Sequence, residues 1–178
     1  MLARWNNSPG SDALSTLVRS FAPFKDETGS QIVEFGLVLL PLLAFLFLII
    51  DIAWICFAQS SLQYAAQMGV RAAVVNPVPP QGMGQDAYLK GVVQSNAMGF
   101  LAGQDGLNEI TIQYYSPSGA AISKGGNTGG NIIEISVNNV AVSSLGPIFR
   151  ETSATLHLNA NSSDVMEALA PGALPPAR

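Results

Sequence analysis

The stretch GSQIVEFGLVLLPLLAFLFLIID, residues 29–51, decides the fold of this chain. After Glu34 come sixteen residues without a charge, and the uncharged run ends at Asp51. A carboxylate beside so apolar a segment is costly unless it is paired or lies at an interface. Both the length of this segment and the acidic residue at its start therefore need a physical explanation.

The apolar segment continues to Ala58 and is long enough to cross a membrane. From Phe35 to Ala58 it has 24 residues and one charge, and as a helix it would be ~36 Å long, against ~30 Å for the bilayer core. A cleaved secretory signal has a shorter apolar core nearer the N-terminus, and a lipoprotein signal would have a small residue where Ile55 precedes Cys56. A buried helix of this length would need a larger domain around it. We therefore predict a transmembrane helix.

The distribution of basic residues predicts the orientation of that helix. Arg4, Arg19 and Lys25 precede it, whereas Arg71 is the only basic residue among the thirty that follow it. Basic residues favour the cytoplasmic side of a membrane. We expect a single-pass protein with its N-terminus in the cytoplasm and the bulk of the chain outside.

The helix is predicted to extend beyond the membrane to Val75. Apolar and small residues recur there at intervals of three and four, with glutamines on another face. The apolar stripe contains Leu62, Ala65, Ala66, Gly69, Val70 and Ala73, and the polar face contains Gln59, Gln63 and Gln67. The pattern predicts one helix over residues 30–75, whose outer half packs on a domain or on neighbouring helices.

The rest of the chain predicts a second helix and a small sheet, separated from the first helix by the Pro-rich break at residues 77–82. Residues 85–101 have helical periodicity. Alternation with a period of two, typical of strands, occurs at residues 110–114, 132–137 and 154–160. The predicted fold class is therefore α+β: a long N-terminal membrane-spanning helix packed by a small domain, residues 76–170, with a second helix and three or four antiparallel strands.

Two further segments are predicted to lack regular structure. Residues 116–130 are rich in glycine and too long for a tight hairpin turn, so we expect a flexible loop. Residues 171–178 are rich in Pro and Ala, and we expect a loose C-terminal tail. Residues 1–29 mix polar and scattered apolar residues without a core pattern, which is typical of a leader or a disordered tail.

Composition argues against several classes of function. The net charge is −4 and charged residues make up 11% of the chain, below the ~25% usual for soluble domains. There is no basic patch, so nucleic acid is not an expected partner. The single cysteine, Cys56, lies in the apolar segment and allows neither an intramolecular disulfide nor a cysteine-based metal cluster.

No group of residues in the sequence predicts catalysis. His157 stands alone on a predicted strand, and Asp86, Asp105 and Glu109 do not have the spacing of a calcium loop. The glycines at residues 125–130 are not followed by a helix, so they do not form a phosphate-binding loop. We expect no enzyme activity, no catalytic residue, no metal and no cofactor; a membrane-tethered hydrolase would have to depend on His157.

Two residues inside the apolar run have their own physical consequences. Pro41 removes a helical hydrogen bond, so a kink or local loosening of the helix is expected there. Asp51 lies 17 residues beyond Glu34, ~25 Å along a helix. We therefore expect Asp51 to be an interfacial carboxylate near the outer surface of the membrane.

The residues around Glu34 resemble the TadE-like pseudopilins of the tight adherence (Tad, or Flp) pilus, a type IV-like system. The resemblance is carried by Gly29, Val33-Glu34-Phe35, the Leu/Pro run at residues 39–43, Ile50-Asp51 and the Ala- and Gln-containing helix at residues 58–73. It covers about residues 29–75. Ser30-Gln31, Trp54 and Cys56 depart from the usual pattern, which affects the subfamily more than the family.

The resemblance implies a specific processing event. A prepilin peptidase would cut after Gly29, so that residues 1–29 are a leader and Ser30 is the new N-terminus. Glu34 would then be the fifth residue of the mature chain, with the aromatic Phe35 in sixth place. The new positive amine of Ser30 would pair with Glu34 of the same or a neighbouring subunit and offset the cost of a carboxylate near hydrocarbon.

The resemblance also implies a role. The chain would be a minor pilin or pseudopilin of the bacterial inner membrane, with a periplasmic domain, that takes part in initiation, tip or assembly of an adhesive pilus. Its partners would be the prepilin peptidase, other pilins, inner-membrane assembly proteins and membrane lipid. The alternative is an uncleaved signal-anchor protein whose external domain binds a ligand or scaffolds an envelope complex.

Overall fold

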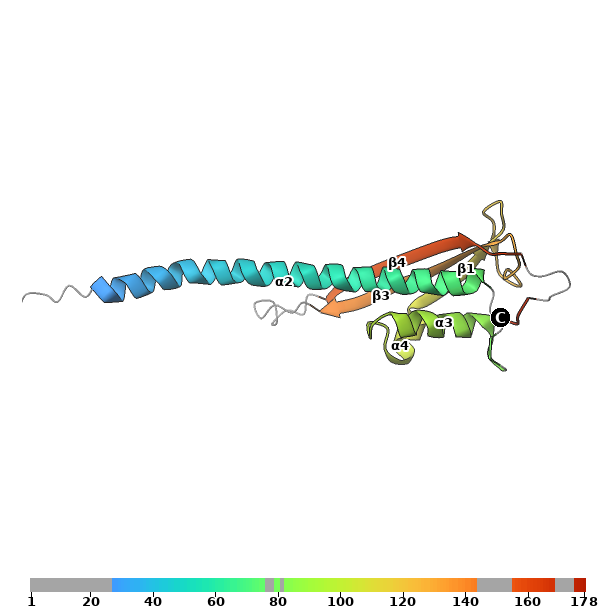
Figure 1. Ribbon diagram of the computed structural model, residues 1–178, viewed down its shortest axis with the longest axis horizontal. Coiled ribbons are helices and arrows are strands. Elements are labelled where there is room, and N and C mark those ends of the chain that lie inside the picture. Colours follow the sequence, from blue (N-terminus) through green and yellow to red (C-terminus); the bar gives the residue numbers. More distant parts are fainter. Residues whose placement is uncertain (1–26, 76–78, 81, 144–154, 169–174) are drawn as a thin grey trace, which may run out of the picture. The chain divides into compact units, whose positions relative to one another are not determined.

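A computed structural model of the chain describes residues 27–75, 79–80, 82–143, 155–168 and 175–178 (Figure 1). Its elements are α2 (Glu27–Val74), α3 (Gln85–Asn96), α4 (Gly103–Asn108), β1 (Ile110–Tyr115), β2 (Ala121–Ile122), β3 (Ile132–Ser143) and β4 (Thr155–Val165). The predicted α+β class, with a long apolar helix, a further helix and a small antiparallel sheet, is confirmed. The chain divides into two compact units, residues 1–44 and 45–178, which are described separately.

The apolar part of α2 has little protein around it. The helix begins three residues before the predicted start and continues through Pro41 without interruption to Val74. It is long and apolar enough to span a membrane, and only 6% of its most apolar 18-residue window is buried. A core helix would be covered by its own domain, so burial within this chain does not account for the composition of α2. Most of the predicted leader, residues 1–26, lies outside the described residues.

The sheet has the order β2-β1-β3-β4, and every neighbouring pair is antiparallel. Alternation sets the register, with Ile112 opposite Ile135 and Val137 opposite Ala160. A β-bulge interrupts the β3–β4 pairing between Val137 and Val140. The predicted loop at residues 116–130 is wrong in one detail, because it contains the two-residue strand β2, which is too short for a periodic signal.

The core of the 45–178 unit lies between the second half of α2, α3 and one face of the sheet (Figure 1). The predicted stripe of α2 is part of it: Leu62, Ala65, Ala66 and Ala73 are fully buried and Val70 is 3% exposed. Gly69 lies where three elements meet. A Cβ at Gly69 would be 2.4 Å from Cγ2 of Val93 on α3 and 2.9 Å from Cδ1 of Ile135 on β3.

The second helix is shorter than predicted. Residues 85–101 were expected to be helical, but α3 ends at Asn96 because Met98 and Gly99 have φ angles of 50° and 90°, and left-handed residues end a helix. The side-chain amide of Gln94 donates to the carbonyls of Leu101 and Gly103, both at 2.7 Å, and so closes the turn. A further short helix, α4, begins at Gly103 directly after this turn.

The described end of the tail differs from the expectation of a loose segment at residues 171–178. The carbonyl of Ala177 accepts a hydrogen bond from the backbone N–H of Gln85 at 2.7 Å. Arg178 forms an ion pair with Asp86 at 3.1 Å. Residues 175–178 are therefore attached to the start of α3 by contacts more than 80 residues apart in sequence, which no local pattern predicts.

Candidate functional site

The residues of the predicted processing site lie in the first turns of α2 and are accessible. Gly29, Ser30 and Glu34 are exposed, and Phe35 is 66% exposed. An added Cβ at Gly29 would meet nothing within 4 Å. Gly29 and Ser30 belong to the first helical turn, whose N–H groups have no partner within the helix. A protein that binds the peptide bond between Gly29 and Ser30 would not have to displace side chains packed around Gly29.

Ser30 and Glu34 lie one helical turn apart. Residues four apart in a helix share a face, with their Cβ atoms ~5–6 Å from each other. A positive charge at the Ser30 nitrogen would therefore lie within reach of the Glu34 carboxylate. This spacing is compatible with the predicted pairing of Ser30 and Glu34, which stays a prediction.

Pro41 is exposed inside α2. Because proline has no N–H, the carbonyl of Leu37 loses its helical partner. The helix nevertheless continues through this position. A bend at Pro41 stays a prediction.

Asp51 lies in the 45–178 unit and differs from its neighbours in burial. Its exposure is 6%, whereas Ile50 and Ile52 are 44% and 53% exposed. The carboxylate was predicted to lie at the outer membrane interface. The structure shows that protein covers it, a feature that depends on tertiary packing and has no signal in the local sequence.

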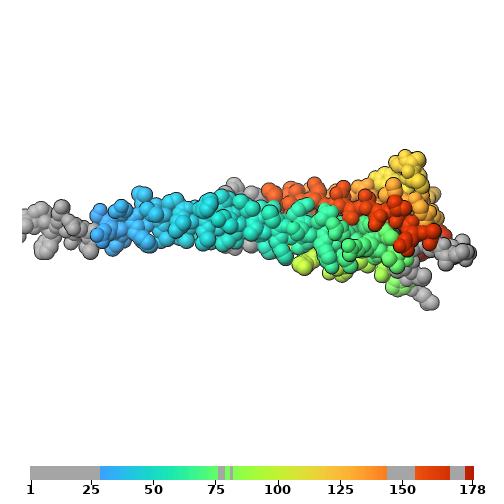
Figure 2. All heavy atoms as spheres, turned by 45° about the horizontal axis from the view of Figure 1, so that its top comes forward, coloured from blue at the N-terminus to red at the C-terminus, as the bar shows by residue number. Residues whose placement is uncertain are grey.

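Two glutamines of α2 bind the free edge of the sheet. The side-chain amides of Gln59 and Gln63 donate to the backbone carbonyls of Asn159 and Asn161, each at 2.8 Å. Figure 2 shows β4 lying along this part of α2. An uncovered edge strand can pair with another chain. Two of the three glutamines of the predicted polar face of α2 thus occupy the edge of β4.

Residues 29–71 match the family model described as TadE-like protein. The resemblance to that family is confirmed. The TadE-like segment covers less than half of the chain and contains the processing site, Pro41, Asp51 and both glutamines that bind β4. No curated protein and no solved structure matches the chain, so inferences about residues 72–178 depend on the structure itself.

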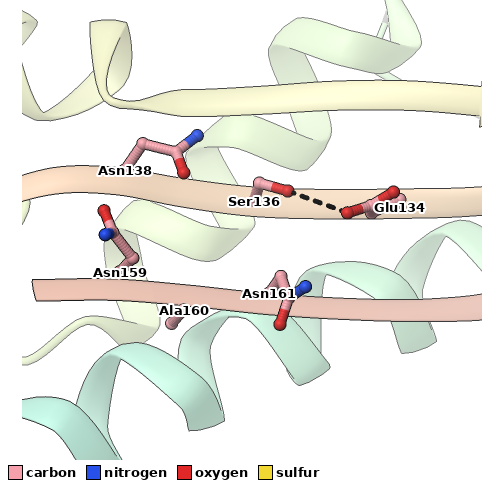
Figure 3. A pocket seen from close by; sticks show the side chains of 6 residues that line it. All are labelled: Glu134, Ser136, Asn138, Asn159, Ala160 and Asn161. Carbon is pink, nitrogen blue, oxygen red and sulfur yellow. Dashed lines mark hydrogen bonds between the residues drawn. The ribbon is translucent and has the colours of Figure 1, made fainter.

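Beyond the TadE-like segment, the face of the sheet opposite the core carries a polar pocket of about 360 Å³ (Figure 3). Its lining residues come from β3 and β4: Glu134, Ser136, Asn138, Asn159, Ala160 and Asn161. The Ser136 hydroxyl donates to the Glu134 carboxylate at 3.3 Å, and the backbone N–H of Asn139 donates to the Asn159 side chain at 2.7 Å. The pocket offers amides, a hydroxyl and one carboxylate. The alternation of β3 and β4 does not reveal this pocket, because its lining combines residues of two strands that are about 25 residues apart in sequence.

The histidine considered for catalysis lies on β4, the strand that supplies Asn159, Ala160 and Asn161 to the pocket. His157 is exposed on β4, and its Nδ1 lies 3.4 Å from the backbone carbonyl of Asn139. Within the described ranges, no three His, Cys, Asp or Glu side chains come together to hold a metal ion. The lining groups of the pocket can bind polar atoms, and they include one hydroxyl, that of Ser136, which donates to the Glu134 carboxylate.

A buried tyrosine connects the sheet, α3 and the end of the chain. The hydroxyl of Tyr114 on β1 donates to Asp86 at 2.9 Å, and the Arg178 guanidinium lies 4.3 Å from the centre of the Tyr114 ring. Burial raises the pKa of Tyr114 above its ordinary 10.0, and the charge of Asp86 and the hydrogen bond to it raise the pKa further, while Arg178 opposes the shift. The fold therefore favours the neutral phenol.

This raised pKa predicts a loss of stability at alkaline pH. Above about pH 10 an unfolded tyrosine releases its proton, whereas folded Tyr114 retains it. The contribution of Tyr114 is therefore complete below that pH, and the free energy of unfolding falls as pH rises, by up to about 1.4 kcal/mol per unit. Urea unfolding of the full chain in detergent at about pH 9 and pH 11 measures the decline. We expect a smaller decline in Tyr114→Phe than in the native chain.

Tyr64→Phe is the matched control, because Tyr64 is 49% exposed. Its removal should leave the alkaline decline as large as in the native chain. An equal decline in the native chain and in Tyr114→Phe would contradict the assignment.

Proposed function

We propose that this chain is a minor pilin or pseudopilin of a Tad-type pilus and that a prepilin peptidase cuts it between Gly29 and Ser30. One observation carries the proposal. The segment that matches the TadE-like model begins at Gly29, and within it an exposed glycine precedes Glu34 by five residues at the start of a membrane-length helix. The TadE-like match suggests association with a Tad pilus, and the processing step is the finer part of the proposal.

The charges of the Ser30 amine and the Glu34 carboxylate suggest what cleavage would achieve. Cleavage would create a positive amine at Ser30, one helical turn from Glu34. Their pairing would reduce the cost of moving that carboxylate away from water. Because the pair exists only in the cut chain, cleavage would change how this end of α2 contacts lipid or another subunit.

The exposed apolar surface of α2 supports assembly with other helices. Ile32, Leu40 and Leu42 are 72%, 71% and 61% exposed. Contiguous apolar surface of this kind is found where proteins meet lipid or other proteins. In the proposed cycle, lipid of the inner membrane covers this surface first, and helices of other pilins or inner-membrane assembly proteins cover it later.

The proposal assigns a structural role to each part of the chain. Residues 1–29 are the cytoplasmic leader, residues 30–75 form the anchor and packing helix, and residues 76–170 form an exported domain. The exported domain contributes to initiation, tip or assembly of the pilus and has no enzymatic role. The rival is an uncleaved signal-anchor protein with an external binding domain.

The mature N-terminus tests the proposal. The full chain is produced together with a prepilin peptidase, and the mass of the membrane-extracted protein is measured. We expect a chain that begins at Ser30. Gly29→Val should remain uncut, because a larger residue would occupy the position before the cut bond.

Gly36→Val is the matched control, because Gly36 lies in the same helix and an added Cβ there also meets nothing within 4 Å. This variant should be cut like the native chain. An intact native chain that stays in the membrane fraction and is absent from sheared surface material would favour the signal-anchor alternative and contradict the proposal.

A further inference from the structure

Three aromatic rings meet where α2 enters the 45–178 unit. Trp54 and Phe57 of α2 have ring centres 5.9 Å apart, and Phe100 lies 5.6 Å from Trp54 and 6.2 Å from Phe57. Such separations are typical of aromatic contacts. The cluster is not fully buried, since Phe57 is 47% exposed. The cluster therefore presents an aromatic surface beside Trp54 and Phe57 of α2.

The turn that supplies Phe100 also projects a methionine outward. Ala97 and Leu101 are fully buried, whereas Met98 between them is 67% exposed. Met98 has a φ angle of 50°, and a left-handed conformation costs a non-glycine residue roughly 1–2 kcal/mol. The hydrogen bonds from Gln94 hold the turn in this shape. The exposed apolar side chain is thus a fixed feature of the turn.

Residue counting places this surface at a membrane boundary. Twenty residues of helix cover the ~30 Å bilayer core, and the twentieth residue counted from Phe35 is Trp54. Tryptophan is enriched at the boundary between lipid and water. The surface also continues into the exposed apolar residues that precede it on α2, such as Phe45 at 60% and Ile52 at 53%.

The surroundings of the cluster suit lipid. Neither residues 52–70 of α2 nor residues 91–104, which include the turn, contain a charged side chain. A partner protein recognised through ion pairs would need exposed charges here, and the nearest charged side chain along α2, Asp51 one turn before Trp54, is only 6% exposed. Continuity with the apolar helix and the absence of charge both favour a lipid surface as the occupant.

We propose that the α3–α4 turn is a second membrane contact, in which Phe100 enters the lipid interface beside Trp54 and Phe57, and Met98 enters it beside Ser61, whose hydroxyl lies 3.8 Å from the Met98 sulfur. This inference depends on the membrane span of the proposed function. The core already joins the exported domain to the second half of α2, so two contacts, one from α2 and one from the turn, would fix the tilt of the domain relative to the membrane surface. The face of the domain that carries the α3–α4 turn would then lie toward the lipid.

Site-directed fluorescence tests the contact on the full chain in vesicles of phosphatidylethanolamine and phosphatidylglycerol. Because Cys56 is the only cysteine, Cys56→Ser provides a background for single labels. A polarity-sensitive dye is attached in Met98→Cys, Phe45→Cys and Ser118→Cys, and lipids with a nitroxide near the headgroup or deep in the chains serve as quenchers. Phe45 reports the span, and exposed Ser118, in the turn before β2, reports water.

We expect the dye at Met98 to lose fluorescence with the shallow nitroxide more than with the deep one. The dye at Phe45 should be quenched by lipid, and the dye at Ser118 only by aqueous iodide. In a Trp5→Phe chain, the unlabelled Trp54 should also be quenched by shallow brominated lipid. Because this last measurement uses no dye, it excludes the possibility that the dye itself causes the membrane contact.

The other outcomes separate this inference from the proposed function. Quenching by lipid at Phe45, with iodide quenching at Met98, would overturn the second contact and leave the membrane span intact. An absence of lipid quenching at both sites would overturn the span and the contact together. Protection of Met98 from both lipid and iodide would mean that a protein, such as a second copy, covers the turn, and would also overturn the inference.

Discussion

Gly69→Val is expected to lower the free energy of unfolding of the 45–178 unit by about 2–3 kcal/mol. A Cβ at this position would lie 2.4 Å from Val93 Cγ2 and 2.9 Å from Ile135 Cδ1. Val93 is β-branched, so its side chain has little rotational freedom, and both neighbours are fully buried. Relief of the clash requires α2 to move away from α3 or β3. Urea unfolding of the full chain in detergent, followed by circular dichroism, measures the loss.

The same substitution at Gly91 is the control. Gly91 lies in α3, and an added Cβ there meets nothing within 4 Å. Valine is a better helix former than glycine, so Gly91→Val should change stability by less than about 0.5 kcal/mol. Equal effects at the two glycines would show that α2, α3 and β3 do not meet at Gly69.

The packing at Gly69 illustrates what the sequence of this chain predicts well. Gly69 belongs to the apolar stripe identified from three- and four-residue spacing, and the structure buries that stripe against α3 and the sheet. The long helix and the longer strands were predictable for the same reason. Each repeats its pattern over several turns or residue pairs, so tertiary contacts reinforce the local signal.

Short elements and distant contacts were not predictable in this way. The strand β2 has two residues and α4 has six, which is too few for a period to appear. The end of α3 depends on left-handed Met98, although methionine rarely adopts that conformation. The contacts of Arg178 with Asp86 and Tyr114 join residues far apart in sequence. No pattern within a short stretch of sequence predicts them.

The candidate processing site is the opposite case, because its residues are neighbours in sequence. Gly29, Ser30 and Glu34 were identified from spacing and resemblance, and the structure adds their exposure in the first turns of α2. For Asp51 the sequence gives the position along the helix, but its burial depends on the packing of the 45–178 unit. Position along α2 was thus predictable, whereas the environment of each side chain was not.

Asn127→Leu is expected to cost about 2–3 kcal/mol of stability, because it removes a donor that two acceptors share. The side-chain amide of Asn127 donates to Gln85 Oε1 at 2.6 Å and to the carbonyl of Pro176 at 2.7 Å. Asn127 is 2% exposed and Gln85 is fully buried. An acceptor left unpaired away from water costs more than the original bond contributes. Urea unfolding of the full chain measures the change.

Asn161→Leu is the control, since Asn161 is exposed on β4 and only its backbone carbonyl bonds to α2. Its cost should be below about 0.5 kcal/mol. A cost as large as that of Asn127→Leu would show that leucine itself, and not the lost hydrogen bonds, is responsible.

A double-mutant cycle tests whether Asn127 and Gln85 act as a pair. Gln85→Met removes the acceptor and keeps a side chain of similar length. If the two amides satisfy each other, the double variant should be more stable than the sum of the single losses predicts, by about 1 kcal/mol. Additive losses would mean that each amide is satisfied elsewhere. A measurable coupling would instead show that a buried polar bond joins the start of α3 to the loop before β3, where Asn127 also donates to the carbonyl of Pro176.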